Sequence, residues 1–238
     1  MILETIAVID FETSGLAPQG GGRATEIAAV LVRGGRIVDS YQSLMKTDAF
    51  IPLFIEQLTG ISNDMVAQAP DAAQVMREVA AFTRHCPLVA HNASFDRGFW
   101  FFELEKAGCE RDAAHEFACT VLLARRLYPE APSCKLGQLA HFHDLPDMGR
   151  AHRALADAQT TAHLLLRMQS DLQTRYSTDL GSAPISHELL SRLQKANKNA
   201  LKRCINDYAR QWNHACLTQA QAELQGMETR ARFLAPDF

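Results

Sequence analysis

The sequence has no apolar run long enough to cross a lipid bilayer and no cysteine pair spaced to hold a metal. Its longest apolar stretches fall far short of the about 20 residues that a transmembrane helix needs. The opening MILETIAVID lacks a basic segment and a cleavage site, so we expect no signal peptide. The six cysteines form no C-x-x-C pair, and we expect reduced thiols in a cytoplasmic protein that does not contact membranes.

Positive charge is not in excess either. The 238 residues carry 24 Lys or Arg against 27 Asp or Glu, which gives a formal net charge of −3. This balance argues against a basic protein that wraps long duplex DNA. It does not argue against an enzyme that acts on nucleic acid, because a cluster of catalytic carboxylates itself lowers the net charge.

What is present is a series of short apolar runs that alternate with amphipathic segments. Three strands joined by short turns come first and are followed by alternating helices and two further short strands. The strands are expected at 6–9, 26–33, 36–46, 87–91 and 116–120, and the main helices at 70–85, 94–108, 120–129 and 152–176. The order predicts an α/β protein with a mixed five-stranded sheet flanked by helices. The glycine-rich stretch at 16–25 is interpreted as a turn, because its glycines are consecutive and a strand follows.

The composition changes after the long helix. A short polar linker at 177–186 separates a domain at 1–176 from a helical C-terminal extension at 187–238. One apolar stripe follows steps of four and three through Leu201, Ile205, Tyr208, Trp212 and Ala215. Between 188 and 213, six basic residues accompany two acidic ones. This basic face is consistent with a solvated helix surface, a contact to a nucleic-acid backbone, or a partner-protein surface.

Two carboxylates follow the first strand in the segment IAVIDFETSG at 6–15. Because side chains alternate along a strand, Asp10 and Glu12 point to the same side. Two like charges held this close repel unless a positive charge offsets them.

Two more acids lie where a packed α/β domain disfavours them. Asp96 follows the strand at 87–91 and opens a helix, a position that a favourable helix dipole also explains. Asp157 lies among small apolar residues on the inward side of the helix at 152–176, and a buried carboxylate there needs a partner. His152 precedes this helix.

Four carboxylates at one end of a sheet would select the hard cations Mg²⁺ or Mn²⁺. They suit a pair of ions about 3.5–4 Å apart, as used in phosphoryl transfer. An imidazole such as that of His152 can accept a proton from an attacking water near neutral pH.

The segments VIDFETSG, HNASFD and HRALADA resemble, in this order, the three motifs of the DEDDh 3′–5′ exonucleases. LTGISNDMVAQAP at 58–70 resembles the segment that these proteins carry before their first long helix, and the resemblance covers residues 4–170. It implies a ribonuclease H-like exonuclease fold and two Mg²⁺ or Mn²⁺ ions. It also implies roles for the five site residues: one ion between Asp10, Glu12 and Asp157, a second between Asp10 and Asp96, and His152 as general base.

The same resemblance implies substrate contacts. Thr13 would contact the 3′ end of a strand, and Leu16 would press on the terminal base. Asn92 and Phe95 are further candidates, for which a turn-forming and a core role are the alternatives. Ser14 replaces a threonine that is common in the family, and Thr59 stands where many relatives carry a histidine.

The function predicted from the sequence is therefore a metal-dependent 3′–5′ exonuclease acting on 3′ ends of single-stranded DNA or RNA, with DNA favoured. An RNA-trimming enzyme resembling RNase T or oligoribonuclease is the first alternative, because discrimination depends on contacts to the 2′-hydroxyl. The second alternative is a binding module that docks on a DNA polymerase subunit through its C-terminal helices. The sequence predicts no oligomeric state.

Overall fold

A computed structural model describes residues 3–234, and the side chains of residues 3–223 and 225. The ends of the two predicted domains, residues 1–2 and 235–238, lie outside the described residues. The sheet has the order β3-β2-β1-β4-β5. Its strands are β1 (Thr5–Thr13), β2 (Ala24–Arg33), β3 (Arg36–Leu44), β4 (Leu88–Ala90) and β5 (Phe117–Cys119). The first three strands pair antiparallel, whereas β4 runs parallel to β1 and β5 parallel to β4. The predicted mixed five-stranded sheet is confirmed.

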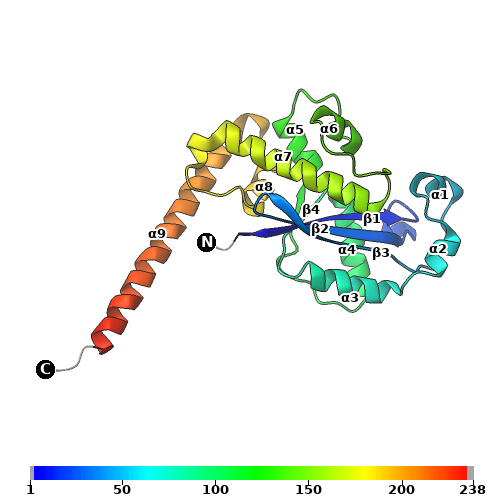
Figure 1. The fold of residues 1–238 in the computed structure, drawn as a ribbon, viewed down its shortest axis with the longest axis horizontal. Helices are drawn as coiled ribbons and strands as arrows, with labels where there is room; N and C mark the ends of the chain where they lie inside the picture. The colour runs from blue at the N-terminus through cyan, green and yellow to red at the C-terminus, as the bar shows by residue number, and fades with distance from the viewer. Residues whose placement is uncertain (1–2, 235–238) are drawn as a thin grey trace.

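Helices cover both faces of this sheet (Figure 1). The helices are α1 (Leu53–Thr59), α2 (Asn63–Ala67), α3 (Ala72–Phe82), α4 (Ser94–Lys106), α5 (Thr120–Leu127), α6 (Leu136–Phe142), α7 (Ala154–Leu180), α8 (His187–Leu193) and α9 (Leu201–Leu234). The long helix α7 crosses one face, and α3 and α4 cover the other (Figure 1). The small pair α1 and α2 lies beyond one end of the sheet (Figure 1).

The alternation along β1 divides the core into two parts. Ile6 and Val8 belong to the hydrophobic cluster under α7, whereas Ala7, Ile9 and Phe11 belong to the cluster under α3 and α4. Apolar residues on both faces are expected of a central strand that is covered on both sides. Phe99 and Trp100 of α4 are fully buried in the second cluster.

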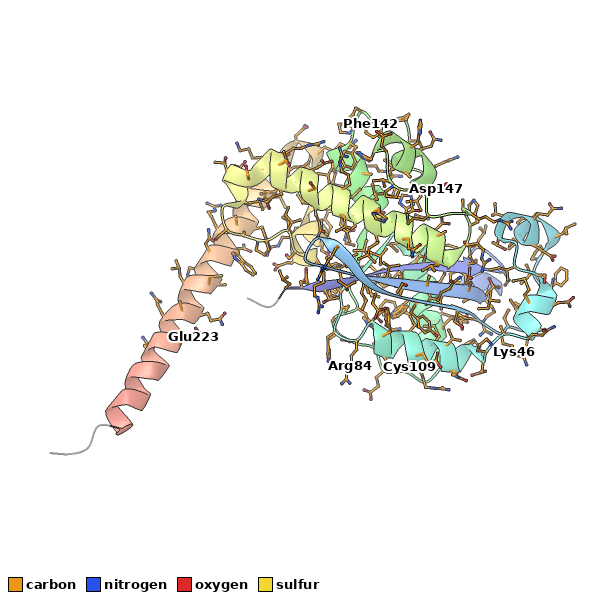
Figure 2. All side chains as sticks on the ribbon, viewed as in Figure 1. Lys46, Arg84, Cys109, Phe142, Asp147 and Glu223 are labelled. Atoms are coloured by element: carbon orange, nitrogen blue, oxygen red, sulfur yellow. The ribbon has the colours of Figure 1, made fainter. Side chains whose placement is uncertain are left out.

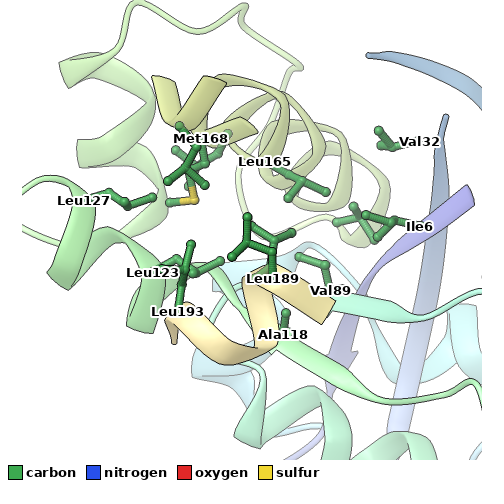
Figure 3. Close-up of a cluster of buried hydrophobic side chains, with 14 of the residues drawn as sticks. Ile6, Val32, Val89, Ala118, Leu123, Leu127, Leu165, Met168, Leu189 and Leu193 are labelled. Carbon is green, nitrogen blue, oxygen red and sulfur yellow. The ribbon is translucent and has the colours of Figure 1, made fainter. Parts of the chain in front are cut away.

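The start of the C-terminal extension packs onto the same core as the rest of the chain. Leu189 and Leu193 of α8 are fully buried, and Figure 3 shows them beside Leu123, Val89 and Leu165. Leu201, Ile205 and Tyr208 of α9 join this cluster, and Trp212 packs against its margin. The extension therefore supplies part of the hydrophobic core on the α7 side.

Two sequence expectations are wrong in detail. Helix α7 continues to Leu180, so residues 177–180 are helical and not linker; the chain kinks at Tyr176, and Leu180 is fully buried. The apolar stripe of α9 ends at Trp212, because Ala215 is exposed. Beyond that point α9 projects away from the sheet, and Figure 2 shows Glu223 on the projecting part.

All six cysteines are free thiols, as expected. Within the described part of the chain, no helix combines the length and apolar character that crossing a bilayer requires.

Candidate active site

Four carboxylates meet at the carboxyl ends of β1 and β4, which are parallel neighbours in the sheet. Asp10 and Glu12 are on β1, Asp96 is in the first turn of α4, which follows β4, and Asp157 is in the first turn of α7. The other three acids all act electrostatically on Asp10, so the four groups share one small volume. The structure therefore brings the four predicted acids together.

The alternation of β1 directs its two acids toward α7. Ile6 and Val8 face the cluster under α7, and Asp10 and Glu12 continue that face toward the strand end. Asp157 projects from the first turn of α7, the helix that covers this face. Small residues flank it, with Ala156 and Ala158 both buried, so the helix start can approach β1 closely.

Asp96 reaches the cluster from the opposite side of the sheet. Its side chain is buried, and the backbone N–H of Phe11 donates a hydrogen bond to Asp96 Oδ1 at 3.2 Å. This bond joins the start of α4 to β1 at Phe11, which lies between Asp10 and Glu12. An acid that only complements the helix dipole would remain at the surface, whereas the Asp96 side chain is buried.

The acids hold protons more tightly than ordinary carboxyl groups. Desolvation and then the charges of Asp96, Glu12 and Asp157 raise the pKa of Asp10 well above its usual value. Desolvation, followed by Asp157 and Glu26, raises the pKa of Glu12 to about 8. Desolvation also raises the pKa of Asp96 to about 7, although the bond from Phe11 opposes it. A bound cation would offset this repulsion, and the oxygen-rich donor set suits Mg²⁺ or Mn²⁺.

His152 lies beside the acids, just before α7. Glu12, His152 and Asp157 can each offer one ligand atom, and these atoms lie within 4.8 Å of one another. His152 is exposed and adopts a left-handed backbone with φ of 61°. Its backbone N–H donates to Asp157 Oδ2 at 2.9 Å, which fixes the turn into the helix. The imidazole is thus attached to the acid cluster and accessible to solvent.

The sequence analysis did not predict two residues of this site, Glu26 and Arg153. Glu26 on β2 lies opposite Glu12 in the strand register and is fully buried. Arg153, between His152 and α7, donates two hydrogen bonds to the Glu26 carboxylate. The sequence held one signal for this pair: Glu26 interrupts an apolar strand that is buried on both faces, and a buried carboxylate requires a basic partner.

The predicted substrate residues differ in their availability. Leu16 is 91% exposed, so it is free to contact a ligand. Thr13 is buried, and its hydroxyl already donates to the Gly15 carbonyl at 2.7 Å. Asn92 has φ of 64°, which confirms a turn-forming role, and it also lines the cleft described below. The ring of Phe95 lies 5.0 Å from that of Phe99, which favours core packing.

A cleft of about 820 Å³ opens onto the acids. Asp10, Asn92, His152 and Asp157 line one part of it. Arg125 and Lys135, both exposed, line the same cleft. The cleft therefore carries basic as well as acidic side chains.

Comparisons with known proteins agree with this geometry. The family model RNase_T, described as an exonuclease, matches residues 7–165. A PolC-type DNA polymerase III of Bacillus subtilis is 38% identical over 168 residues, which cover 71% of this chain and 12% of that protein. The 3′-5′ exonuclease DinG of the same organism is 37% identical over 174 residues, which cover 71% of this chain and 18% of that protein. The chain thus spans less than a fifth of the length of these curated relatives.

The solved structure of exonuclease X in complex with 5′ overhanging duplex DNA is similar to this chain. It is 32% identical, and the match covers 69% of this chain and 91% of that chain with a TM-score of 0.56.

Proposed function

The chain belongs to the exonuclease family and has its ribonuclease H-like fold, and on that premise we propose that it is a metal-dependent 3′–5′ exonuclease. It would hydrolyse phosphodiester bonds at the 3′ ends of single-stranded nucleic acid, with DNA preferred, and release nucleoside 5′-monophosphates. The observation that carries this proposal is the convergence of Asp10, Glu12, Asp96 and Asp157 beside His152.

The acid cluster fits two divalent cations. We assign Asp10, Glu12 and Asp157 to one Mg²⁺ or Mn²⁺ and Asp10 with Asp96 to the other. The donor set supports this assignment, because four carboxylates that repel one another in one small volume select hard divalent cations. When bound, such ions supply the positive charge that stabilises the developing negative charge on the scissile phosphate.

The remaining residues act on the water and on the strand. We assign His152 as the general base that accepts a proton from the attacking water, because its ring is exposed beside Glu12 and Asp157. Leu16 supports the terminal base, and Thr13 contacts the 3′ nucleotide through its backbone, since its hydroxyl is already engaged. Asn92, which lines the cleft, is assigned a supporting contact to the strand, whereas Phe95 packs against Phe99 beside the site.

We favour DNA as the substrate because two of the similar proteins are named for DNA. The similar proteins include a PolC-type DNA polymerase and an exonuclease whose structure holds duplex DNA with a 5′ overhang. The polymerase relative also makes a DNA polymerase the candidate protein partner. The free thiols agree with action in a reducing compartment such as the cytoplasm.

The proposal is tested with DNA and RNA oligonucleotides of matched sequence, each labelled at the 5′ end, in the presence of Mg²⁺. We expect a ladder of products shortened from the 3′ end, faster on DNA, and no products with EDTA or with Asp10→Ala. Faster cleavage of RNA would favour the RNA-trimming alternative. Cleavage by Asp10→Ala at the wild-type rate would overturn the assignment of the site, and binding of a polymerase without any turnover would favour a binding module.

A further inference from the structure

We propose that the buried Glu26–Arg153 ion pair is a positioning element that fixes His152 and Asp157 relative to Glu12. This inference rests on the proposed exonuclease function. Neither residue touches the cleft, so the pair acts through the residues that it holds.

The pair is built as a fork. Arg153 Nη2 lies 2.7 Å from Glu26 Oε1, and Arg153 Nε lies 3.1 Å from Glu26 Oε2. The Glu26 side chain is only 1% exposed, whereas that of Arg153 is 33% exposed. Two parallel bonds between planar groups fix orientation as well as distance, which a single contact to a lysine would not do.

Glu26 also holds the first amide of α7. The backbone N–H of Ala154 donates to Glu26 Oε2 at 3.0 Å, and Gln42 Nε2 donates to Glu26 Oε1 at 2.7 Å. The N-cap residue of this helix, Arg153, forms no side-chain cap of its own. The side chain of Glu26 on β2 therefore satisfies the first backbone N–H of the helix that carries Asp157.

The position of the pair in the chain explains what it fixes. Arg153 directly follows His152 and precedes Asp157 by one helical turn, and His152 N–H is bonded to Asp157. Glu26 is opposite Glu12 across the β1–β2 ladder. The ion pair, the peptide bond between His152 and Arg153, and the bond from His152 N–H to Asp157 thus connect the strand beside Glu12 to both site residues.

Glu26 adds a carboxylate beside an already crowded cluster, and its charge contributes to the raised pKa of Asp10 and Glu12, whereas Arg153 lowers that of Glu12. Buried ion pairs add little net stability compared with apolar residues of similar volume. The geometry that the pair imposes on the helix start is the more specific consequence.

The chain offers a matched control. Arg23 Nε and Nη2 lie 2.8 and 3.0 Å from the Glu103 carboxylate, and Ala24 N–H donates to Glu103 Oε1 at 3.3 Å. The Glu103 side chain is also 1% exposed. This second fork joins β2 to α4, so it resembles the first in burial and bonding but bonds to neither His152 nor Asp157.

The experiment compares Arg153→Lys and Glu26→Gln with the control Arg23→Lys. Three quantities are measured: steady-state kinetics on a single-stranded oligonucleotide, Mn²⁺ binding without substrate, and the melting temperature. We expect Arg153→Lys and Glu26→Gln to lower kcat by about 10–100-fold and to weaken Mn²⁺ binding by a similar factor, while KM changes by less than about 3-fold. Arg23→Lys should lower the melting temperature by a comparable amount and leave kcat and Mn²⁺ binding within about 3-fold of wild type.

The double variant Glu26→Gln/Arg153→Gln removes both charges together, so it leaves no unpaired buried charge. It can be compared with Arg23→Lys if a single variant does not fold. Wild-type kcat and Mn²⁺ affinity in the Glu26 and Arg153 variants would overturn the inference. Equal losses in Arg23→Lys would overturn it too, because fold stability would then explain them. An inactive wild-type protein would count against the proposed function, and Mn²⁺ binding would still decide the role of the pair.

Discussion

Replacing Glu12 by Gln is expected to stabilise the metal-free protein while removing its activity. Glu12 is 9% exposed, and its pKa is raised from 4.5 to about 8 by desolvation and the neighbouring acids. Between these pH values the folded state holds a proton that the unfolded chain has released. The free energy of unfolding therefore falls as the pH rises, and Gln removes this penalty without changing the shape of the side chain.

The size of the effect follows from the shift. At about 1.4 kcal/mol per pKa unit, the shift to about 8 corresponds to at most about 5 kcal/mol at pH 8 and about 1 kcal/mol at pH 5. The neighbouring acids share part of this penalty, so we expect a net gain of about 2–4 kcal/mol at pH 8. For a chain of this size, the melting temperature should rise by about 5–15 °C.

The assay is thermal unfolding of wild type and Glu12→Gln in EDTA at pH 5, 6.5 and 8. Glu105→Gln, an exposed position on α4, is the control and should show no pH-dependent difference from wild type. Added Mg²⁺ should stabilise wild type more than Glu12→Gln, because the variant lacks one of the proposed ligands. A Glu12→Gln variant no more stable than wild type at pH 8, or equally stabilised at pH 5 and pH 8, would show that the buried Glu12 carboxylate does not destabilise the metal-free protein.

Three further substitutions separate activity from stability. Asp96→Asn keeps an acceptor for the Phe11 N–H and removes a carboxyl group whose pKa is raised to about 7, so the melting temperature in EDTA at pH 8 should be no lower than that of wild type, while kcat in the oligonucleotide assay falls by about 100-fold or more; near-wild-type kcat would contradict its role. Leu16→Ala removes a side chain that is 91% exposed, so urea unfolding should change by less than about 0.5 kcal/mol, whereas KM for single strands rises about 3- to 10-fold. Leu190→Ala creates a cavity where α8 packs on the core, so the free energy of unfolding in urea should fall by about 2–5 kcal/mol. A fall of less than about 1 kcal/mol would show that the extension does not share the core.

Much of the fold could be predicted because its signals are local. The hairpin at Gly34 and Gly35, the β-branched strand before Asp10 and the amphipathic helix that becomes α7 are each visible within a few residues. The four acids were also visible, because a carboxylate within an apolar run is conspicuous. In the structure, the acids of β1 and of the helix after β4 come together because these strands are parallel and their carboxyl ends meet.

The remaining features depend on contacts between distant segments. Glu26 and Arg153 are separated by 127 positions, so the sequence alone does not pair them. The burial of Leu180 that extends α7 depends on packing against a core assembled from several elements. The stripe of α9 continues to Ala215 in the sequence, but the surface that it covers ends near Trp212.

The proposed two-metal site is tested most directly by a crystal soaked with Mn²⁺ and a nucleoside 5′-monophosphate, with data collected to locate manganese by anomalous scattering. We predict two manganese ions, one among Asp10, Glu12 and Asp157 and one between Asp10 and Asp96, with the phosphate beside both and His152 facing it. Manganese bound elsewhere, or a nucleotide bound away from these four carboxylates, would contradict the account.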